Sequence, residues 1–215
     1  MKMHVSAQET LRNVCCAYRV GDMAPRDRTT LTSATSMRVL AHPTRLRLLG
    51  LLRERGPQTA AQLGDVVDEA PGTISYHLSK LASIALIEPA EAQSTDLRER
   101  WWQATSTLTS WEPAELLDDP EKLAASSTLQ KSITQAYASR YTDYIDAMPA
   151  LPREWVAAGA NGDRSLRLTV DELAEMRDDM EAFVERWVQR SEAHEATVDD
   201  DAEPVVLVYQ AYRRP

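Results

Sequence analysis

Residues 70–87 combine a one-sided apolar pattern with an opposite side that could bind an anion. At about 100° per residue, Ile74, Leu78 and Leu81 fall on one face of a helix. The opposite side holds a glycine, short hydroxyls, a tyrosine and a lysine: Gly72, Thr73, Tyr76, Ser79, Lys80 and Ser83. No carboxylate occurs from Gly72 to Ile87. Hydroxyls, an aromatic tip and an ammonium group without neighbouring carboxylates suit the phosphates and base edges of a nucleic acid.

The segments before this stretch are expected to hold it in a helix-turn-helix unit. Apolar spacing predicts helices over residues 31–41 and 44–55, and Pro43 suits the first turn of the second one. Thr59 followed by Gln62 is a capping box, which predicts the start of a short third helix. A turn then leads into the stretch described above, so that a short helix, a turn and a second helix follow one another.

After this helix the spacing changes to short β-type patterns. Residues 86–92 and 97–105 are expected to form a β-hairpin, the wing of a winged helix-turn-helix domain. Arg98 and Arg100 lie near its tip, within reach of phosphates or a minor groove. Because Glu99 separates them, an ordinary solvated strand is the alternative interpretation.

Four further side chains have expected roles. Trp101 and Trp102 are expected to pack the wing onto the body of the domain. His77 lies at the edge of the apolar stripe and is expected to support a neighbouring helix through a hydrogen bond. Arg45 either contacts a phosphate or pairs with a nearby acid.

Together these residues resemble the ArsR-like winged helix-turn-helix transcriptional regulators of bacteria, over residues 31–107. The matching pieces are His42-Pro43-Thr44-Arg45, Ser75-Tyr76-His77-Leu78, Leu86-Ile87 and Arg98-Glu99-Arg100-Trp101-Trp102. More loosely, residues 121–215 resemble the C-terminal region of a longer subgroup whose helix starts with the pattern seen from Leu168 to Leu173.

The resemblance implies a regulator, more specifically a repressor, that binds double-stranded DNA at a palindromic operator as a homodimer. Two-fold symmetry would place the two recognition helices about 34 Å apart. The DNA-binding residues would be Gly72, Thr73, Ser75, Tyr76, Ser79 and Lys80, with Arg45, Arg98 and Arg100.

The sequence departs from the family pattern at two places. Ala85 stands where a glycine usually ends the recognition helix in the left-handed conformation, so some strain is expected there. Metal-sensing members carry a Cys-x-Cys pair in the first helix of the motif, whereas this chain has Gln62-Leu63-Gly64-Asp65. His194 also lacks a second histidine at ligand spacing, so we expect no metal sensing and no cofactor.

The fold class expected is α+β, mainly α: a winged helix-turn-helix domain followed by a helical C-terminal domain with a small β-sheet. The ranges expected are a flexible arm (1–30), the winged domain (31–107), a linker (108–120) and a dimerisation or effector domain (121–215). Within the last range the patterns predict helices over 121–148, 152–158 and 169–193, the last opened by a Thr169–Glu172 capping box. They also predict strands over 164–168 and 205–212, the second of them buried.

An aromatic and apolar stripe runs through the predicted C-terminal helices, and in the helix over 169–193 it has the a/d spacing of a packed seam. Its members are Tyr137, Tyr141, Tyr144, Trp155, Leu173, Met176, Met180, Phe183 and Trp187. Such stripes are usually buried, so a dimer interface or core is favoured and a pocket for a small-molecule effector is the alternative.

Composition narrows the function classes. The chain has 215 residues, a net charge of −9 and only Cys15 and Cys16, too few for a disulfide framework. Its acidity lies in residues 108–215, with 11 basic and 22 acidic groups, while residues 31–107 carry 8 of each. This charge balance argues against a protein that coats nucleic acid non-specifically. It is compatible with a DNA-binding domain whose few basic groups are gathered in one place. With neither a secretory signal nor a long apolar run, we expect a cytoplasmic protein without a membrane span.

Two other function classes remain open. The neutral charge of residues 31–107 is compatible with a winged-helix protein-interaction module that does not bind DNA. Common catalytic motifs are missing from the sequence, so no enzyme is expected. An enzyme in the C-terminal half would need a cleft with perturbed carboxylates.

Overall fold

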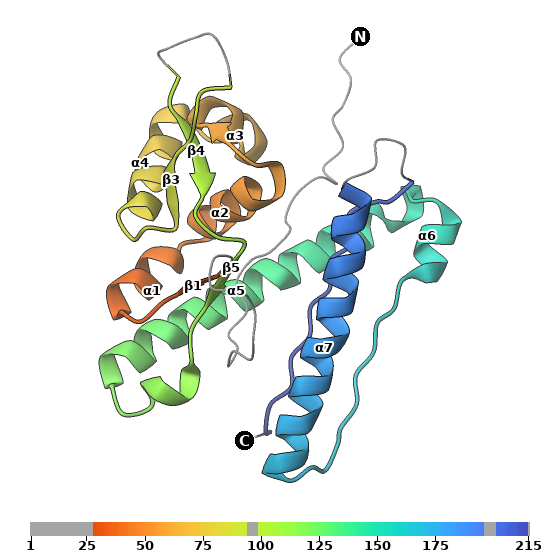
Figure 1. Ribbon diagram of the computed structural model, residues 1–215. Coiled ribbons are helices and arrows are strands. Elements are labelled where there is room, and N and C mark those ends of the chain that lie inside the picture. The colour runs from red at the N-terminus through yellow and green to blue at the C-terminus, as the bar shows by residue number, and fades with distance from the viewer. Residues whose placement is uncertain (1–27, 94–98, 196–200, 215) are drawn as a thin grey trace. The chain divides into compact units, whose positions relative to one another are not determined.

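A computed structural model describes residues 28–93, 99–195 and 201–214. The chain divides into two compact units, with the division between Ile145 and Asp146, and each unit is considered by itself. Helices predominate, and the strands of the described residues lie in the first unit (Figure 1). The predicted mainly helical class with a small β-sheet is confirmed. Among the described residues, no helix is long and apolar enough to span a bilayer.

The first two helices of the first unit are α1 (Ala34–Leu40) and α2 (Pro43–Arg55). Ser33 caps α1, because its hydroxyl accepts the Ser36 N–H at 3.0 Å. Pro43 opens α2 as predicted, and the leucines of α2 are almost fully buried. The cap of α2 is His42, whose Nδ1 accepts the Thr44 N–H at 3.2 Å.

The helix-turn-helix unit consists of α3 (Ala60–Val67) and α4 (Pro71–Ala82), packed against each other (Figure 1). The predicted capping box is present: Thr59 N–H donates to Gln62 Oε1 at 2.8 Å, and Gln62 N–H donates to Thr59 Oγ1 at 3.3 Å. The turn between the helices starts at Asp68, which has φ 58°. A Cβ on Gly64 would lie 2.7 Å from the Glu69 carbonyl oxygen, so the turn requires glycine there.

The C-terminal end of α4 forms a Schellman motif around Ala85. Ala85 has φ 56°, as expected from its place in the family pattern. The Leu86 N–H donates to the Leu81 carbonyl, and the Ala85 N–H donates to the Ala82 carbonyl. Leu81 and Leu86 are both 0% exposed, which supplies the apolar contact that accompanies this motif. The helix therefore ends where predicted, but on a residue with a Cβ.

The wing is an antiparallel sheet in the order β2 (Gln58–Thr59), β4 (Trp101–Ala104), β3 (Ile87–Pro89). The predicted hairpin is confirmed for the described parts of both strands, while β2 was not predicted. Trp101 and Trp102 are 7% and 5% exposed, as expected for side chains that pack the wing onto the domain.

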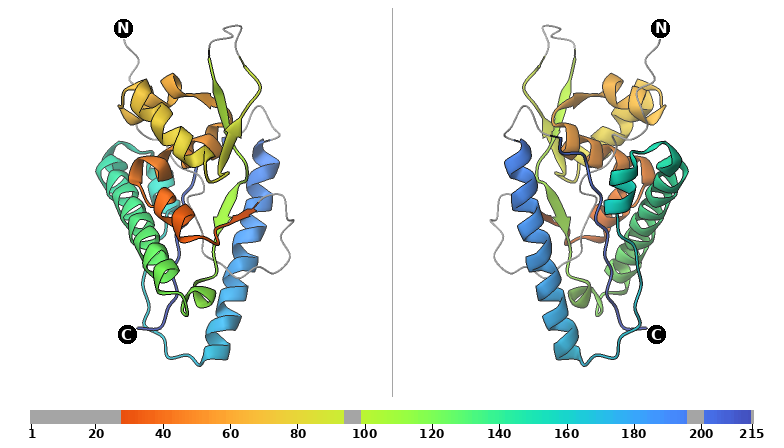
Figure 2. Two further views of the ribbon diagram at one scale, coloured as in Figure 1. Left: turned by 90° about the vertical axis from the view of Figure 1, so that its left-hand side faces the viewer. Right: turned by 90° about the vertical axis from the view of Figure 1, so that its right-hand side faces the viewer.

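A second, parallel pair of strands joins β1 (Arg28–Thr30) to β5 (Leu108–Ser110). After β5 come the 3₁₀ turn η1 (Pro113–Leu116) and the long helix α5 (Pro120–Ala147). Trp111 in this connection and Leu129 and Ile133 of α5 belong to the same buried core as α1 to α4. Accordingly, α5 lies beside α1 in each view (Figure 2).

The second unit holds a short turn η2 (Met148–Ala150), α6 (Arg153–Ala158) and α7 (Val170–Glu195). The predicted capping box of α7 is present, with Thr169 N–H donating to Glu172 Oε2 at 2.7 Å. The strands predicted over 164–168 and 205–212 are wrong, because both segments lack secondary structure and are almost entirely exposed. A strand needs a hydrogen-bonded neighbour, and β propensity alone does not supply one.

Candidate nucleic-acid interface

The polar side of α4, which the sequence predicted to bind nucleic acid, is exposed to solvent. Its buried residues are Ile74, His77, Leu78 and Leu81. After Pro71, the exposed residues are Gly72, Thr73, Ser75, Tyr76, Ser79 and Lys80. The helix therefore separates an apolar face, packed on the domain, from a polar face with a lysine and no carboxylate.

Tyr76 is the most prominent side chain of this face, with 56% of its surface exposed. Its ring is flanked by the Lys80 ammonium group, 5.6 Å from the ring centroid, and by the His77 ring, whose centroid lies 5.3 Å away in a T-shaped arrangement. A cation held over a tyrosine ring adds about 0.5–1 kcal/mol at an exposed site. This interaction favours a common orientation in which the phenol and the ammonium group face the same ligand.

The hydroxyl groups of α4 are already partly engaged. Ser79 Oγ donates to the Ser75 carbonyl at 2.8 Å, and Ser83 Oγ donates to the Lys80 carbonyl at 2.7 Å. A serine that bonds back to its own helix still has lone pairs with which to accept. Ser79 can therefore accept a hydrogen bond from a base amino group more readily than it can donate one to a phosphate.

The N-terminus of α4 has no side-chain cap, because Ala70 stands at that position and Pro71 follows it. The N–H groups of the first turn are then left to water or to an anion. Gly72 has nothing within 4 Å of where a Cβ would lie, so this turn can approach another backbone closely.

His77 lies on the buried side of α4. It is 7% exposed, and its ring lies 4.6 Å from the ring of His42, the cap of α2. The hydrogen bond expected from His77 is not made at Nδ1, which is buried without a partner among the described residues. Burial lowers the pKa of His77, and the nearby His42 and Arg45 lower it further, while Glu69 opposes them. No role for His42 beside His77 was predicted, although its place at the start of α2 marks it as a cap.

Arg45 comes from α2 and makes no ion pair among the described residues. Its Nε is buried without a hydrogen-bond partner there. Burial lowers the pKa of Arg45, and the Tyr76 phenol acts in the opposite direction. Of the two roles considered for Arg45, pairing with a nearby acid is therefore not seen.

Of the two arginines predicted near the tip of the wing, the structure describes only Arg100. Arg98 lies outside the described residues. The Arg100 guanidinium lies 4.1 Å from the centroid of the Trp102 ring, on which it stacks while remaining exposed. The DNA-contacting roles of Arg98 and Arg100 stay predictions.

The residues of the predicted C-terminal stripe lie on α5, α6 and α7. Tyr141 and Tyr144 stack with their centroids 5.9 Å apart, and Phe183 and Trp187 lie 6.3 Å apart on α7. Every side chain from Val170 to His194 is half-buried or exposed, including Leu173, Met176 and Met180. The alternative that the stripe is core stays a prediction. The interface and effector roles of Tyr137, Trp155 and the other stripe residues stay predictions.

In the part of the chain that the structure describes, no three of His, Cys, Asp and Glu are grouped so that they could hold a metal ion. Cys15 and Cys16 lie outside that part.

Comparison with known proteins agrees with this arrangement. Residues 40–90 match a family model described as a helix-turn-helix domain. No curated protein matches the sequence. The chain therefore contains a helix-turn-helix domain, and the match spans α2, β2, α3, α4 and β3.

Three of the solved structures that match this chain have titles that describe transcriptional regulators. The structure of "Possible transcriptional regulator for arsenical resistance" has 29% identity and a TM-score of 0.29, covering 46% of this chain and 83% of that one. A MarR family regulator from Neisseria meningitidis has 18% identity and a TM-score of 0.27, with coverages of 74% and 80%. A transcriptional regulator homologue from Pyrococcus horikoshii has 17% identity and a TM-score of 0.29, with coverages of 47% and 86%. Because these TM-scores are low, the functional interpretation rests on residues 40–90 and the geometry of α4.

Proposed function

We propose that this protein is a DNA-binding transcriptional regulator that inserts α4 into the major groove. The observation that carries the proposal is the division of α4 into a buried apolar face and an exposed face with Tyr76, Ser79 and Lys80 but no carboxylate. A major groove admits one helix and is lined by phosphates, so a carboxylate on this face would be repelled. The helix-turn-helix match over residues 40–90 supports the same role.

The finer proposal is a repressor that binds a palindromic operator as a homodimer, without sensing a metal. The exposed stripe on α7, with Phe183 45% and Trp187 53% exposed, supports it, because two copies could bury these residues together. In a two-fold dimer the α4 helices would enter the DNA about 34 Å apart. A small molecule that binds near the stripe could then change the spacing of the two helices.

Fluorescence anisotropy with labelled DNA from the region upstream of the protein's own gene tests the role of α4. Lys80→Glu should weaken binding to all sequences, since it places a carboxylate against phosphates. Tyr76→Ala should change the preference among sites by about 1–3 kcal/mol for each base that the tyrosine reads. Lys131→Glu, the same charge reversal on the exposed side of α5, is the matched control. If Lys80→Glu and Tyr76→Ala bind as the wild type does, α4 does not lie in the groove.

The balanced charge of residues 31–107 leaves a protein-interaction module as the second candidate function. The same titration decides between them. A complex that weakens steeply with salt indicates DNA binding, while no complex at low ionic strength favours the interaction module.

A further inference from the structure

A shallow depression lies beside the exposed face of α4, where α1, α2 and α4 meet. It is lined by Thr35, Arg38, Val39, Arg45 and Lys80. Three of these five side chains are cations, and its described lining contains no carboxylate. Thr35 and Arg38 come from α1, for which the sequence predicted no functional role. Converging cations from separate helices are a feature of anion-binding sites.

Two of the cations have no counter-charge in the part of the chain that the structure describes. Among the described residues, neither Arg45 nor Lys80 forms an ion pair, and the buried Nε of Arg45 has no hydrogen-bond partner. A buried donor without a hydrogen-bond partner is unfavourable, because it has lost its bonds to water. The lowered pKa of Arg45 has burial as its first cause, in keeping with a cation that has lost water without gaining an anion. An oxyanion in the depression would supply the counter-charge that Arg45 lacks among the described residues.

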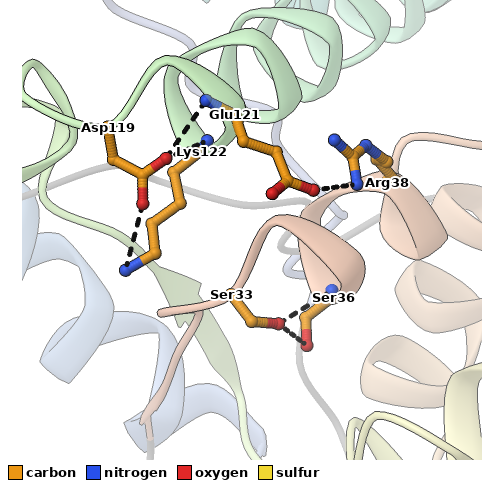
Figure 3. Close-up of polar contacts among 6 residues, drawn as sticks. All are labelled: Ser33, Ser36, Arg38, Asp119, Glu121 and Lys122. Atoms are coloured by element: carbon orange, nitrogen blue, oxygen red, sulfur yellow. Dashed lines mark hydrogen bonds and ion pairs between the residues drawn. The ribbon is translucent and has the colours of Figure 1, made fainter.

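The third cation can turn toward the same anion. Arg38 Nη1 donates to Glu121 Oε1 of α5 at 2.8 Å (Figure 3), and the two side chains are 51% and 68% exposed. An ion pair this exposed contributes little to stability, because water and salt screen it. Arg38 therefore loses little when it exchanges the Glu121 carboxylate for another anion.

We propose that this depression binds one phosphate-type oxyanion, held by Arg38, Arg45 and Lys80, with the Thr35 hydroxyl as a neutral donor. The planar guanidinium groups suit two oxygens of one phosphate each, and Lys80 acts as a point charge. The oxyanion could belong to the DNA backbone or be free phosphate. Lys80 shares the exposed face of α4 with Tyr76, so the backbone source follows if α4 lies in the major groove, and to that extent it rests on the proposed function.

The first experiment measures the salt dependence of binding to one fixed duplex for Arg38→Ala and Arg45→Ala. Removing one phosphate-binding cation should reduce the slope of log K against log salt by about one. At 0.1 M salt this slope change corresponds to roughly an eightfold loss of affinity, the same for different sequences. Thermal melts of each variant establish that it is folded.

Two control variants separate the depression from general effects. Arg47→Ala removes a cation from the same helix α2, outside the depression, where Arg47 Nη2 donates to the Val66 carbonyl at 3.0 Å. It should leave the slope unchanged. Glu121→Gln breaks the ion pair with Arg38 but keeps the arginine, and it should leave the affinity unchanged or raise it. If Glu121→Gln weakens binding as much as Arg38→Ala does, Arg38 acts only through its ion pair with α5 and binds no anion. That result would overturn the proposal.

The second experiment titrates inorganic phosphate into the DNA-free protein and follows its ¹H–¹⁵N spectrum. A reduced salt slope in the variants with only weak phosphate binding assigns the depression to the DNA backbone. Saturable phosphate binding that Arg45→Ala abolishes, with an unchanged slope, assigns it to the free anion. If neither effect occurs, the depression binds no oxyanion. If the wild type fails to bind DNA, the proposed function fails, and the phosphate titration alone decides the site.

Discussion

At the scale of single residues, Ala85 is held in a conformation that its Cβ disfavours. With φ 56° it ends α4 where glycine would be unstrained, and it is exposed. We expect Ala85→Gly to raise the free energy of unfolding by about 0.5–1 kcal/mol, measured by urea titration. Ala82→Gly, the same change in the last turn of the helix, should lower it by a similar amount. Equal effects of the two changes would contradict the role of the backbone conformation.

At Gly64, in contrast to Ala85, the structure requires glycine. Alanine normally stabilises a helix relative to glycine by about 1 kcal/mol. At Gly64 the added methyl group would lie 2.7 Å from the Glu69 carbonyl oxygen, in backbone that cannot easily move. Gly64→Ala should therefore lower the midpoint of thermal unfolding, while Gly72→Ala, which meets open space, should raise it or leave it unchanged. A Gly64→Ala protein as stable as the wild type would mean that the turn after α3 can shift.

Much of the candidate site could be predicted residue by residue. The exposed face of α4 follows from helical spacing alone, because Ile74, Leu78 and Leu81 must turn toward the core. The pairing of His42 with His77 could not be predicted, since it depends on how α2 and α4 cross. Arg38 was missed for the same reason: only the folded chain brings α1 to the depression with Lys80.

At the scale of elements, the start of α2 depends on a neutral histidine. His42 Nδ1 can accept the Thr44 N–H only when that nitrogen carries no proton. Burial lowers the pKa of both His42 and His77 from 6.5, and Arg45 lowers both further. Glu69 acts in the opposite direction on each, and His42 adds to the lowering at His77. The unfolded chain then binds protons first as the pH falls.

The stability contributed by this pair is therefore complete above about pH 6.5 and is lost as the pH falls through the lowered values. We expect the thermal midpoint to fall from pH 7.5 to pH 5.5. His42→Asn keeps a cap acceptor without a titrating ring and should make this fall smaller. His194→Gln, on the exposed end of α7, is the control and should leave the fall unchanged. An identical pH profile for His42→Asn and the wild type would rule out the cap as its source.

The helices were predicted closely because caps and apolar spacing are local signals. The capping boxes at Thr59 and Thr169 both start helices at the expected places. Strands were predicted less well. Residues 205–212 have strong β propensity but no strand partner among the described residues, whereas β2 is only two residues long and pairs because β4 lies beside it.

At the scale of the whole molecule, the proposed dimer requires the stripe on α7. Phe183→Asp puts a charge into that stripe and should shift the sedimentation coefficient from dimer to monomer, with weaker DNA binding at nanomolar protein concentration. Ala182→Asp introduces the same charge at the neighbouring exposed position, outside the stripe, and should leave the dimer intact. Dimers of unchanged stability in both variants would place the interface elsewhere.

The parallel pairing of β1 with β5 has a consequence for the order of folding. Arg28 is paired with Leu108, so the strands that precede and follow the winged domain join across nearly its whole length. The helix-turn-helix unit and the hairpin form through interactions between nearby residues. Closing such a long loop costs more chain entropy, which is repaid only once the intervening core exists. We therefore expect the β1–β5 pair to form last, so that substitutions there speed unfolding while hardly slowing folding.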